Sequence, residues 1–386
     1  MQDSRATTAQ SEREFASLVE SLAADPTRRE QLTDLLREDH PCYDQRGTAA
    51  IVRMRGWVLH ALSQVGLSES TLIFVLEELD TGVDAYLVAA AARALRSYSN
   101  PAAFFAPYLI RALANIRYRD EPVSFESYGA YSESHGATSP VRELLATLEW
   151  MGPSAREFLS QIESLGAQDG GLPKRLRDDV DRAVKAIRRG DQTSEPNHHS
   201  CCASPAAVNS VVSWARDTRC SSESVEKIVF EDHEGASLTF KEFFYGHPSI
   251  VVFFYTRCDN PLKCSLTITK LAYVQKLLRE QGLSELIHTA AITYDPAYDL
   301  PERLRAYGKH RGVRLHAGHR MLRSIDSFDA LRSYFELGVN FIESLVNRHQ
   351  VQAYVLDNDG RIAASFERLH WDEQTLVDRA SALLRE

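Results

Sequence analysis

The C-terminal half of the chain is organised around the stretch Ile250-Val251-Val252-Phe253-Phe254-Tyr255-Thr256-Arg257-Cys258-Asp259-Asn260-Pro261-Leu262-Lys263-Cys264-Ser265. Residues 250–255 form an apolar run rich in β-branched and aromatic side chains, which predicts a strand buried on both faces. The run ends in a loop bounded by Cys258 and Cys264, and a helical pattern follows. Two thiols at the exit of a central strand predict redox chemistry or soft-metal binding. A nearby helix start, Arg257 and Lys263 are all expected to lower the thiol pKa values.

The length and composition of the chain limit the classes of protein to which it can belong. At 386 residues the chain is long for one core, so two domains are expected. The net charge of −9 and the lack of a basic patch with interleaved aromatics predict no nucleic-acid partner. No apolar run approaches the length that spans a bilayer, so we expect no membrane partner. The polar opening, without an apolar signal core, predicts a cytoplasmic location. In that reducing compartment the six cysteines are expected to be thiols, metal ligands or catalytic groups.

Residues 1–190 have the pattern of an all-α domain. Short amphipathic segments are joined by brief turns and pair as hairpins. The expected helices cover 11–24, 27–38, 53–64, 69–79, 84–98, 101–116, 141–165 and 177–189. His60-Ala61-Leu62, Arg93-Ala94-Leu95 and Ala146-Thr147-Leu148 stand at similar places in successive hairpins. This pattern resembles a HEAT-like α-solenoid, and an irregular helical bundle is the alternative.

A long insertion at 117–140 interrupts the helices. It carries Tyr118, Phe125, Tyr128 and Tyr131 among serines, glutamates and glycines. A long loop that bears aromatic side chains in a compact domain is often functional. The alternative is a surface insertion that packs its own aromatics.

The segment 191–223 reads as a linker, and a short helix is expected after Ser204-Pro205. Within it, His198, His199, Cys201 and Cys202 form a small group of soft-metal ligands. The group predicts a second metal or thiol-exchange cluster. Vicinal cysteines ligate one ion less readily than a Cys-x-x-Cys pair, so chance clustering in a linker is the alternative.

Residues 224–386 alternate strands and helices. We expect strands at 227–230, 237–240, 250–255, 287–294, 351–356 and 362–366, and helices at 266–281, 301–307, 327–337 and 372–384. His310, His316 and His319 fall in a loop-rich section, either as a solvated loop or as groups that help to capture a metal. The order of elements predicts an α/β thioredoxin-like domain with extra N-terminal strands.

Four landmarks in this domain together resemble the Sco/SenC family of copper-binding, thioredoxin-fold proteins. An aromatic residue, Tyr255 and Thr256 lead into Cys258, and Cys264 stands for the second cysteine of the family. The segment Asp295-Pro296-Ala297-Tyr298-Asp299-Leu300-Pro301-Glu302 is similar to the family's Asp-Pro-x-x-Asp-x-Pro-Glu. His349, five residues before Tyr354, matches the family's copper-binding histidine. The resemblance covers the C-terminal domain alone.

The resemblance implies that Cys258, Cys264 and His349 bind copper. Asp295 is expected to support the site from behind, and a turn former before Pro296 is the alternative. Two thiolates and one imidazole suit Cu(I), and an added oxygen would complete a site for Cu(II) or Zn(II). The chain departs from the family in having five residues, rather than three, between the cysteines. A longer loop can still bring both sulfurs to one ion, with a different spacing between the two sulfur atoms.

Three functions follow. The first is a Sco-like metallochaperone or copper sensor, which delivers copper to, or senses it for, a protein client docked on the helical domain. The second is a thiol-disulfide oxidoreductase that acts through the Cys258/Cys264 pair. The third is a protein-interaction scaffold with a vestigial thioredoxin-like domain. A peroxidase is disfavoured because Thr256 stands two residues before Cys258 instead of three, and a thioredoxin-type reductase because Cys-x-x-Cys is absent.

Overall fold

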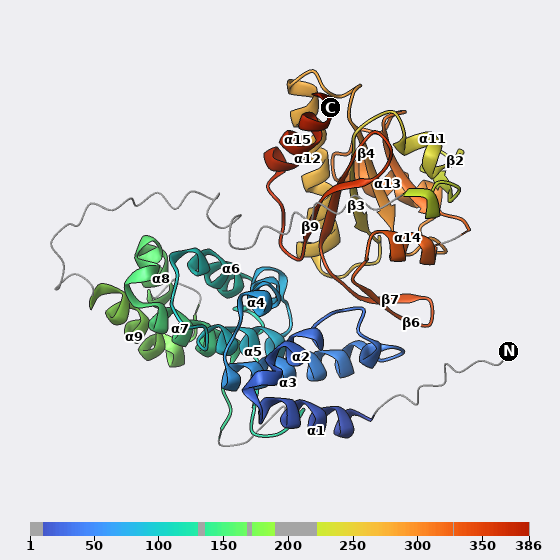
Figure 1. Cartoon of the computed structure of the whole chain (residues 1–386). Coiled ribbons are helices and arrows are strands. Elements are labelled where there is room, and N and C mark those ends of the chain that lie inside the picture. Colours follow the sequence, from blue (N-terminus) through green and yellow to red (C-terminus); the bar gives the residue numbers. More distant parts are fainter. Residues whose placement is uncertain (1–10, 130–135, 168–171, 190–221, 327, 386) are drawn as a thin grey trace. The chain divides into compact units, whose positions relative to one another are not determined.

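The chain divides into two compact units in a computed structural model, Met1–Val212 and Ser213–Glu386 (Figure 1). The structure describes residues 11–129, 136–167, 172–189, 222–326 and 328–385. The predicted linker 191–223 lies outside these ranges up to residue 221, so its boundaries stay predictions. Each unit is described by itself.

The described part of the N-terminal unit is helical, as expected. Its α-helices are α1 (Glu12–Ala23), α2 (Arg29–Asp34), α3 (Thr48–Val65), α4 (Glu69–Thr81), α5 (Ala85–Leu95), α6 (Ala106–Ile116), α7 (Pro140–Met151), α8 (Leu159–Gly166) and α9 (Arg177–Arg188). Helices α3, α5, α7 and α9 pack in series, and α4 packs on α5 and α6. Ser11 begins α1 through a capping box with Glu14, and Asp84 caps α5.

The helices expected over 141–165 are present. They are α7 and α8, with a 3₁₀ segment (Gly152–Phe158) between them. Gly152 adopts a φ of 51°, and Pro153 follows it. A positive φ and a missing N–H both end an α-helix, so the chain continues only after a tighter turn.

The insertion at 117–140 packs its aromatic side chains onto the helices. The Phe125 ring stacks on His60 of α3 and on Tyr86 of α5, with ring centroids 5.0 and 5.1 Å away. The Tyr128 hydroxyl donates to Glu12 Oε2 at 2.7 Å. This matches the reading of a surface insertion that packs its own aromatics, while Tyr131 lies outside the described residues.

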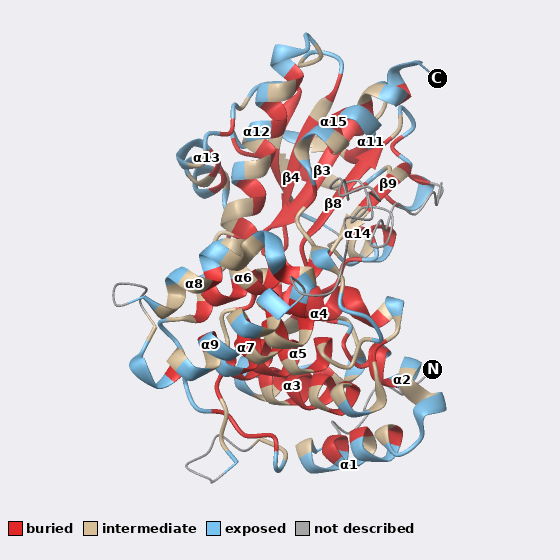
Figure 2. Ribbon diagram, turned by 90° about the vertical axis from the view of Figure 1, so that its left-hand side faces the viewer, coloured by how far each residue is buried: buried red, intermediate tan, exposed pale blue. Residues whose placement is uncertain are grey.

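The C-terminal unit is built on one mixed sheet. The strands are β1 (Val229–Asp232), β2 (Ser237–Thr239), β3 (Ser249–Phe254), β4 (His288–Thr293), β5 (His319–Ser324), β6 (Val339–Ile342), β7 (Leu345–His349), β8 (Gln352–Leu356) and β9 (Ile362–Glu367). Seven of them form a sheet in the order β2-β1-β5-β4-β3-β8-β9, and β6 pairs with β7 alone. Strands β3, β4 and β5 are parallel, and β8 runs antiparallel to β3. Every residue of β3 is buried, as expected for a central strand (Figure 2).

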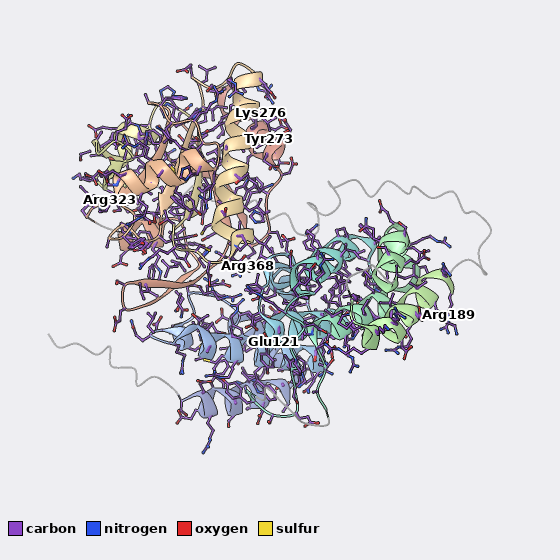
Figure 3. The ribbon with its side chains drawn as sticks, turned by 180° about the vertical axis from the view of Figure 1, so that it is seen from behind. Glu121, Arg189, Tyr273, Lys276, Arg323 and Arg368 are labelled. Atoms are coloured by element: carbon purple, nitrogen blue, oxygen red, sulfur yellow. The ribbon has the colours of Figure 1, made fainter. Side chains whose placement is uncertain are left out.

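Helices cover this sheet and confirm the α/β thioredoxin-like class. They are α11 (Phe240–Phe244), α12 (Leu266–Glu280), α13 (Pro301–His310), α14 (Phe328–Tyr334) and α15 (Glu373–Ala382). Helices α12 and α15 pack on each other and on β3, while α13 packs on β5. Tyr273 and Lys276 project from the outer side of α12, with the Lys276 ammonium 5.3 Å from the Tyr273 ring centroid (Figure 3). Within the described ranges, no helix combines the length and the apolar character needed to cross a bilayer.

The expected loop around His316 and His319 is partly wrong, because 319–324 is the sheet strand β5. Two arginines conceal its strand pattern, and both are paired with acids of the neighbouring strand β1. Arg323 Nε donates to Glu231 Oε2 at 2.6 Å, and Arg320 pairs with Asp232. The β6–β7 hairpin was not expected either, and the predicted strand 237–240 ends in the short helix α11.

Candidate metal centre

Cys258 is held at the exit of β3 by a buried carboxylate. The chain leaves β3 at Phe254, and the Thr256 amide donates to Asp299 Oδ2 at 3.1 Å. The hydroxyls of Thr256 and Thr293 donate to the same carboxylate, the second at 2.5 Å. Burial raises the pKa of Asp299, although these hydrogen bonds act in the opposite direction. Asp299 thereby ties the ends of β3 and β4 together.

The five residues between the cysteines form a compact turn. Asn260 Oδ1 accepts a hydrogen bond from the Leu262 amide at 2.9 Å, and a π-helical turn (Pro261–Ser265) follows. A π turn is wider than an α turn and is frequent at functional sites. It carries Cys264, which is buried, back towards Cys258. The turn accommodates all five residues between the cysteines, so the two thiols stay close together.

Lys263, inside this turn, reaches the strand that carries the third site residue. Its side chain is 7% exposed, and Nζ donates to the His349 carbonyl at 2.8 Å. His349 is the last residue of β7, where it pairs with Val339 of β6. One hydrogen bond thus links the cysteine turn to a residue more than eighty positions further along the chain.

The structure brings Cys258, Cys264 and His349 together. His349 Nε2 lies 3.6 Å from Cys258 Sγ and 3.4 Å from Cys264 Sγ. All three ligand atoms lie within 4.8 Å of one another. His349 Nδ1 lies 2.9 Å from the Gln350 carbonyl and donates to it, which turns Nε2 towards the sulfurs. The ring packs against Tyr255 and Tyr294, with centroids 5.4 and 5.3 Å away.

The two thiols differ in their electrostatics. The pKa of Cys258 is lowered, first by a hydrogen bond from Cys264 and then by His349, while burial opposes the shift. The pKa of Cys264 is raised, first by burial and then by its interaction with Cys258. Cys258 is therefore the first of the two thiols to lose its proton. Neither forms a disulfide.

Asp295 lies behind the site and touches neither sulfur. Its Oδ2 accepts from Arg257 Nε at 3.0 Å, and Arg257 is the residue before Cys258. The Arg257 guanidinium also lies 4.0 Å from the Tyr298 ring centroid. Asp295 thus fixes the side chain that precedes the first thiol.

The other sequence candidates are elsewhere or not described. His198, His199, Cys201 and Cys202 lie outside the described residues. His316 and His319 stand at the start of β5, whereas the cysteines follow the end of β3. Sequence reasoning missed the roles of Asp299 and Lys263. Asp299 is the second acid of the Asp-Pro-x-x-Asp segment, and that position was the signal for it.

The C-terminal unit thus combines a thioredoxin-like sheet with two thiols beyond the carboxyl end of its central strand and an imidazole from β7, a donor set that suits a thiophilic metal. Residues 217–385 match the family model described as SCO1/SenC. This match confirms the Sco/SenC resemblance for the C-terminal part of the chain.

Several solved structures are similar to this part. A SCO1/SenC family lipoprotein from Bacillus anthracis is 19% identical over 42% of this chain and 94% of its own, with a TM-score of 0.36. Yeast Sco1 is 25% identical over 42% of this chain and 98% of its own, with a TM-score of 0.33. Bradyrhizobium japonicum ScoI with copper bound is 18% identical over 39% of this chain and 94% of its own, with a TM-score of 0.32. No curated protein matches the chain.

The residues at the site fit a thiophilic ion. Two sulfurs and one nitrogen are soft or borderline donors, and they suit Cu(I). The Nδ1–H of His349 is held by a backbone carbonyl, as is usual for a histidine that binds a metal. Lys263 and Asp299 orient the ligands without touching the ion position.

Replacing Lys263 tests this orientation. Lys263→Met keeps the aliphatic stem but removes the hydrogen bond to the His349 carbonyl. We expect Cu(I) affinity to fall by about 10–100-fold, the range for the loss of a group that orients a ligand. A Cu(I) competition titration with a chromophoric chelator measures the change. Lys276→Met on the outside of α12 is the matched control and should bind as the unchanged protein does. An equal affinity in both variants would contradict the orienting role.

Proposed function

We propose that the C-terminal domain binds copper through Cys258, Cys264 and His349 and delivers it to, or senses it for, a protein client. The observation that carries this proposal is the convergence of the three ligand atoms within 4.8 Å. The SCO1/SenC match over residues 217–385 supports copper as the ion.

The chemistry of the donors favours Cu(I). Cu(I) accepts two sulfurs and one nitrogen without a fourth ligand, whereas Cu(II) or Zn(II) would need an added oxygen. The Cys258 thiolate is the first ligand to be available, and Cys264 gives up its proton when the ion binds. Tyr255 and Tyr294 pack against His349 and limit the access of water to its ring.

We expect the copper site to require all three residues. Cys258→Ser, Cys264→Ser and His349→Ala each remove one strong donor, so each variant should lose tight stoichiometric Cu(I) binding. Anaerobic Cu(I) titration, followed by metal analysis of the purified protein, measures this. Equal binding by the unchanged chain and all three variants would leave the cysteines as packing residues and would refute the proposal.

The helical unit is the proposed place for the client. The series of α3, α5, α7 and α9 supports a HEAT-like stack, whose repeats commonly present extended binding surfaces. In this proposal the protein works in the cytoplasm.

Client docking is tested separately from copper binding. A pull-down with residues 1–190 should recover the client, because the docking surface is proposed to lie in the helical unit alone. Quantitative mass spectrometry against a pull-down with residues 213–386 identifies it. Recovery of the client only by the C-terminal piece would contradict docking on the helices.

A second candidate is thiol–disulfide exchange by the same pair, favoured by the unequal thiols. The Cys258 thiolate would attack a client disulfide and release one client thiolate. Cys264 would then lose its proton and displace the second client thiolate. The Cys258–Cys264 disulfide forms, and two electrons pass to the client.

Alkylation separates the two thiols. Cys264→Ala removes the donor that chiefly lowers the Cys258 pKa, so the pH midpoint of Cys258 alkylation should rise. Cys264→Ser keeps an O–H donor and should shift the midpoint less. Iodoacetamide labelling followed by mass spectrometry over a pH series measures both. A native pair that forms no disulfide under strong oxidant would exclude the redox function and leave the copper proposal standing.

A further inference from the structure

A group of histidines lies at the amino-terminal ends of the parallel strands, whereas the cysteines lie beyond the carboxyl-terminal end of β3. His288 and His319 are the first residues of β4 and β5, and His316 forms a bridge with His319 just before β5. His247 precedes β3 by two residues. Since β3, β4 and β5 are parallel, their starts share one edge, while the cysteine turn follows the end of β3.

The rings of this histidine cluster (His247, His288, His316 and His319) are in contact. His247 stacks on His288 with ring centroids 4.3 Å apart, and His316 lies 4.1 Å from His319. Gly318 allows the two pairs to approach each other. A Cβ at this position would stand 3.0 Å from His288 Cδ2, 3.4 Å from His288 Nε2 and 3.5 Å from His316 Cε1. The missing side chain therefore lets the His288 and His316 rings come close on either side of the backbone.

One histidine of the cluster differs from the other three because both of its ring nitrogens are hydrogen-bonded. His319 is buried, with Nδ1 bonded to the Gly318 carbonyl at 2.9 Å and Nε2 bonded to Ser284 Oγ at 3.2 Å. Both of its nitrogens are used, so His319 supports the cluster and binds nothing further.

The remaining three rings keep nitrogens for a ligand. His288 Nδ1 donates to the Phe243 carbonyl at 3.1 Å, which leaves a lone pair on Nε2. His316 Nδ1 accepts from the Gly318 amide at 3.2 Å, so this ring offers a lone pair to an ion only when it turns and gives up that one bond. Among the described residues, no group hydrogen-bonds to the ring of His247. The nearby cation Arg320 is paired with Asp232, which offsets its charge.

We propose that His247, His288 and His316 bind a divalent transition metal ion of the Cu(II) or Zn(II) class, at a site separate from Cys258, Cys264 and His349. Imidazole nitrogens suit these borderline ions, and the absence of a thiolate among the three ligands disfavours Cu(I). The carbonyl-bound Nδ1 of His288 is the usual support for a histidine ligand.

We expect two of the three rings to rotate when the ion binds, so that their nitrogens reach it. In the part of the chain that the structure describes, only the Cys258 group has three ligand atoms within 4.8 Å of one another. His288 is the fixed ligand because its Nδ1 is held. His316 is exposed and His247 half-buried, so both rings have room to turn towards His288 Nε2.

The test is Zn(II) binding by the full chain with Cys258→Ser and Cys264→Ser, which removes the thiol site. Adding His247→Ala and His316→Ala to this background should weaken one Zn(II) equivalent by at least about tenfold. Competition with a chromophoric chelator measures affinity and stoichiometry. Both proteins keep residues 190–221, so any binding by His198, His199, Cys201 or Cys202 cancels in the comparison.

Two matched variants sharpen the result. His310→Ala removes an exposed histidine at the end of α13 and should leave Zn(II) binding unchanged. Gly318→Ala puts a methyl group against the His288 and His316 rings and should weaken the same equivalent that the double histidine variant loses. Binding that is equal in the background and the double variant, or an equal loss in His310→Ala, would overturn the proposal. Neither outcome bears on copper at Cys258, because the test lacks that site.

Discussion

The chemistry of the C-terminal unit depends on how His349 is held against the cysteine turn. Its ring nitrogen faces both sulfurs, and its carbonyl accepts from the buried Lys263 of the same turn. The Lys263 hydrogen bond fixes the backbone of His349 beside the turn, while packing against Tyr255 and Tyr294 keeps its ring at the sulfurs. The Gln350 carbonyl accepts from Nδ1 and fixes the orientation of the ring. The ligand geometry is therefore set by the fold before any ion binds.

The electrostatics of the thiols differ from what the sequence indicates. Arg257 and Lys263 flank the cysteines and were expected to lower their pKa values. In the structure Arg257 is paired with Asp295, and Lys263 donates to a backbone carbonyl. The low pKa of Cys258 comes chiefly from Cys264 and His349. Through these contacts the two cations stabilise the turn. Their charges contribute less to the low pKa of Cys258 than Cys264 and His349 do.

The sequence predicted the elements that are specified by residues close to one another along the chain. The apolar run of β3 and the Asp372 cap of α15 were both expected, and both are present. β5 was missed because Arg320 and Arg323 look solvated in sequence, whereas they pair with acids on β1. The β6–β7 hairpin turns at Glu343, with a φ of 52°, and so lacks the usual glycine or asparagine signal. His349 could be predicted only by resemblance, because its partners lie far away in sequence.

The longer cysteine spacing shows which feature of the site is constrained. Five residues replace three, yet both sulfurs reach the same imidazole. The Asn260 turn and the π turn take up the added length within the loop, and Lys263, one of the five, forms the hydrogen bond to His349. Had the loop only been lengthened, its ordering on metal binding would cost more conformational entropy. Here the longer loop supplies its own anchor, so five residues between the cysteines still leave both sulfurs beside His349.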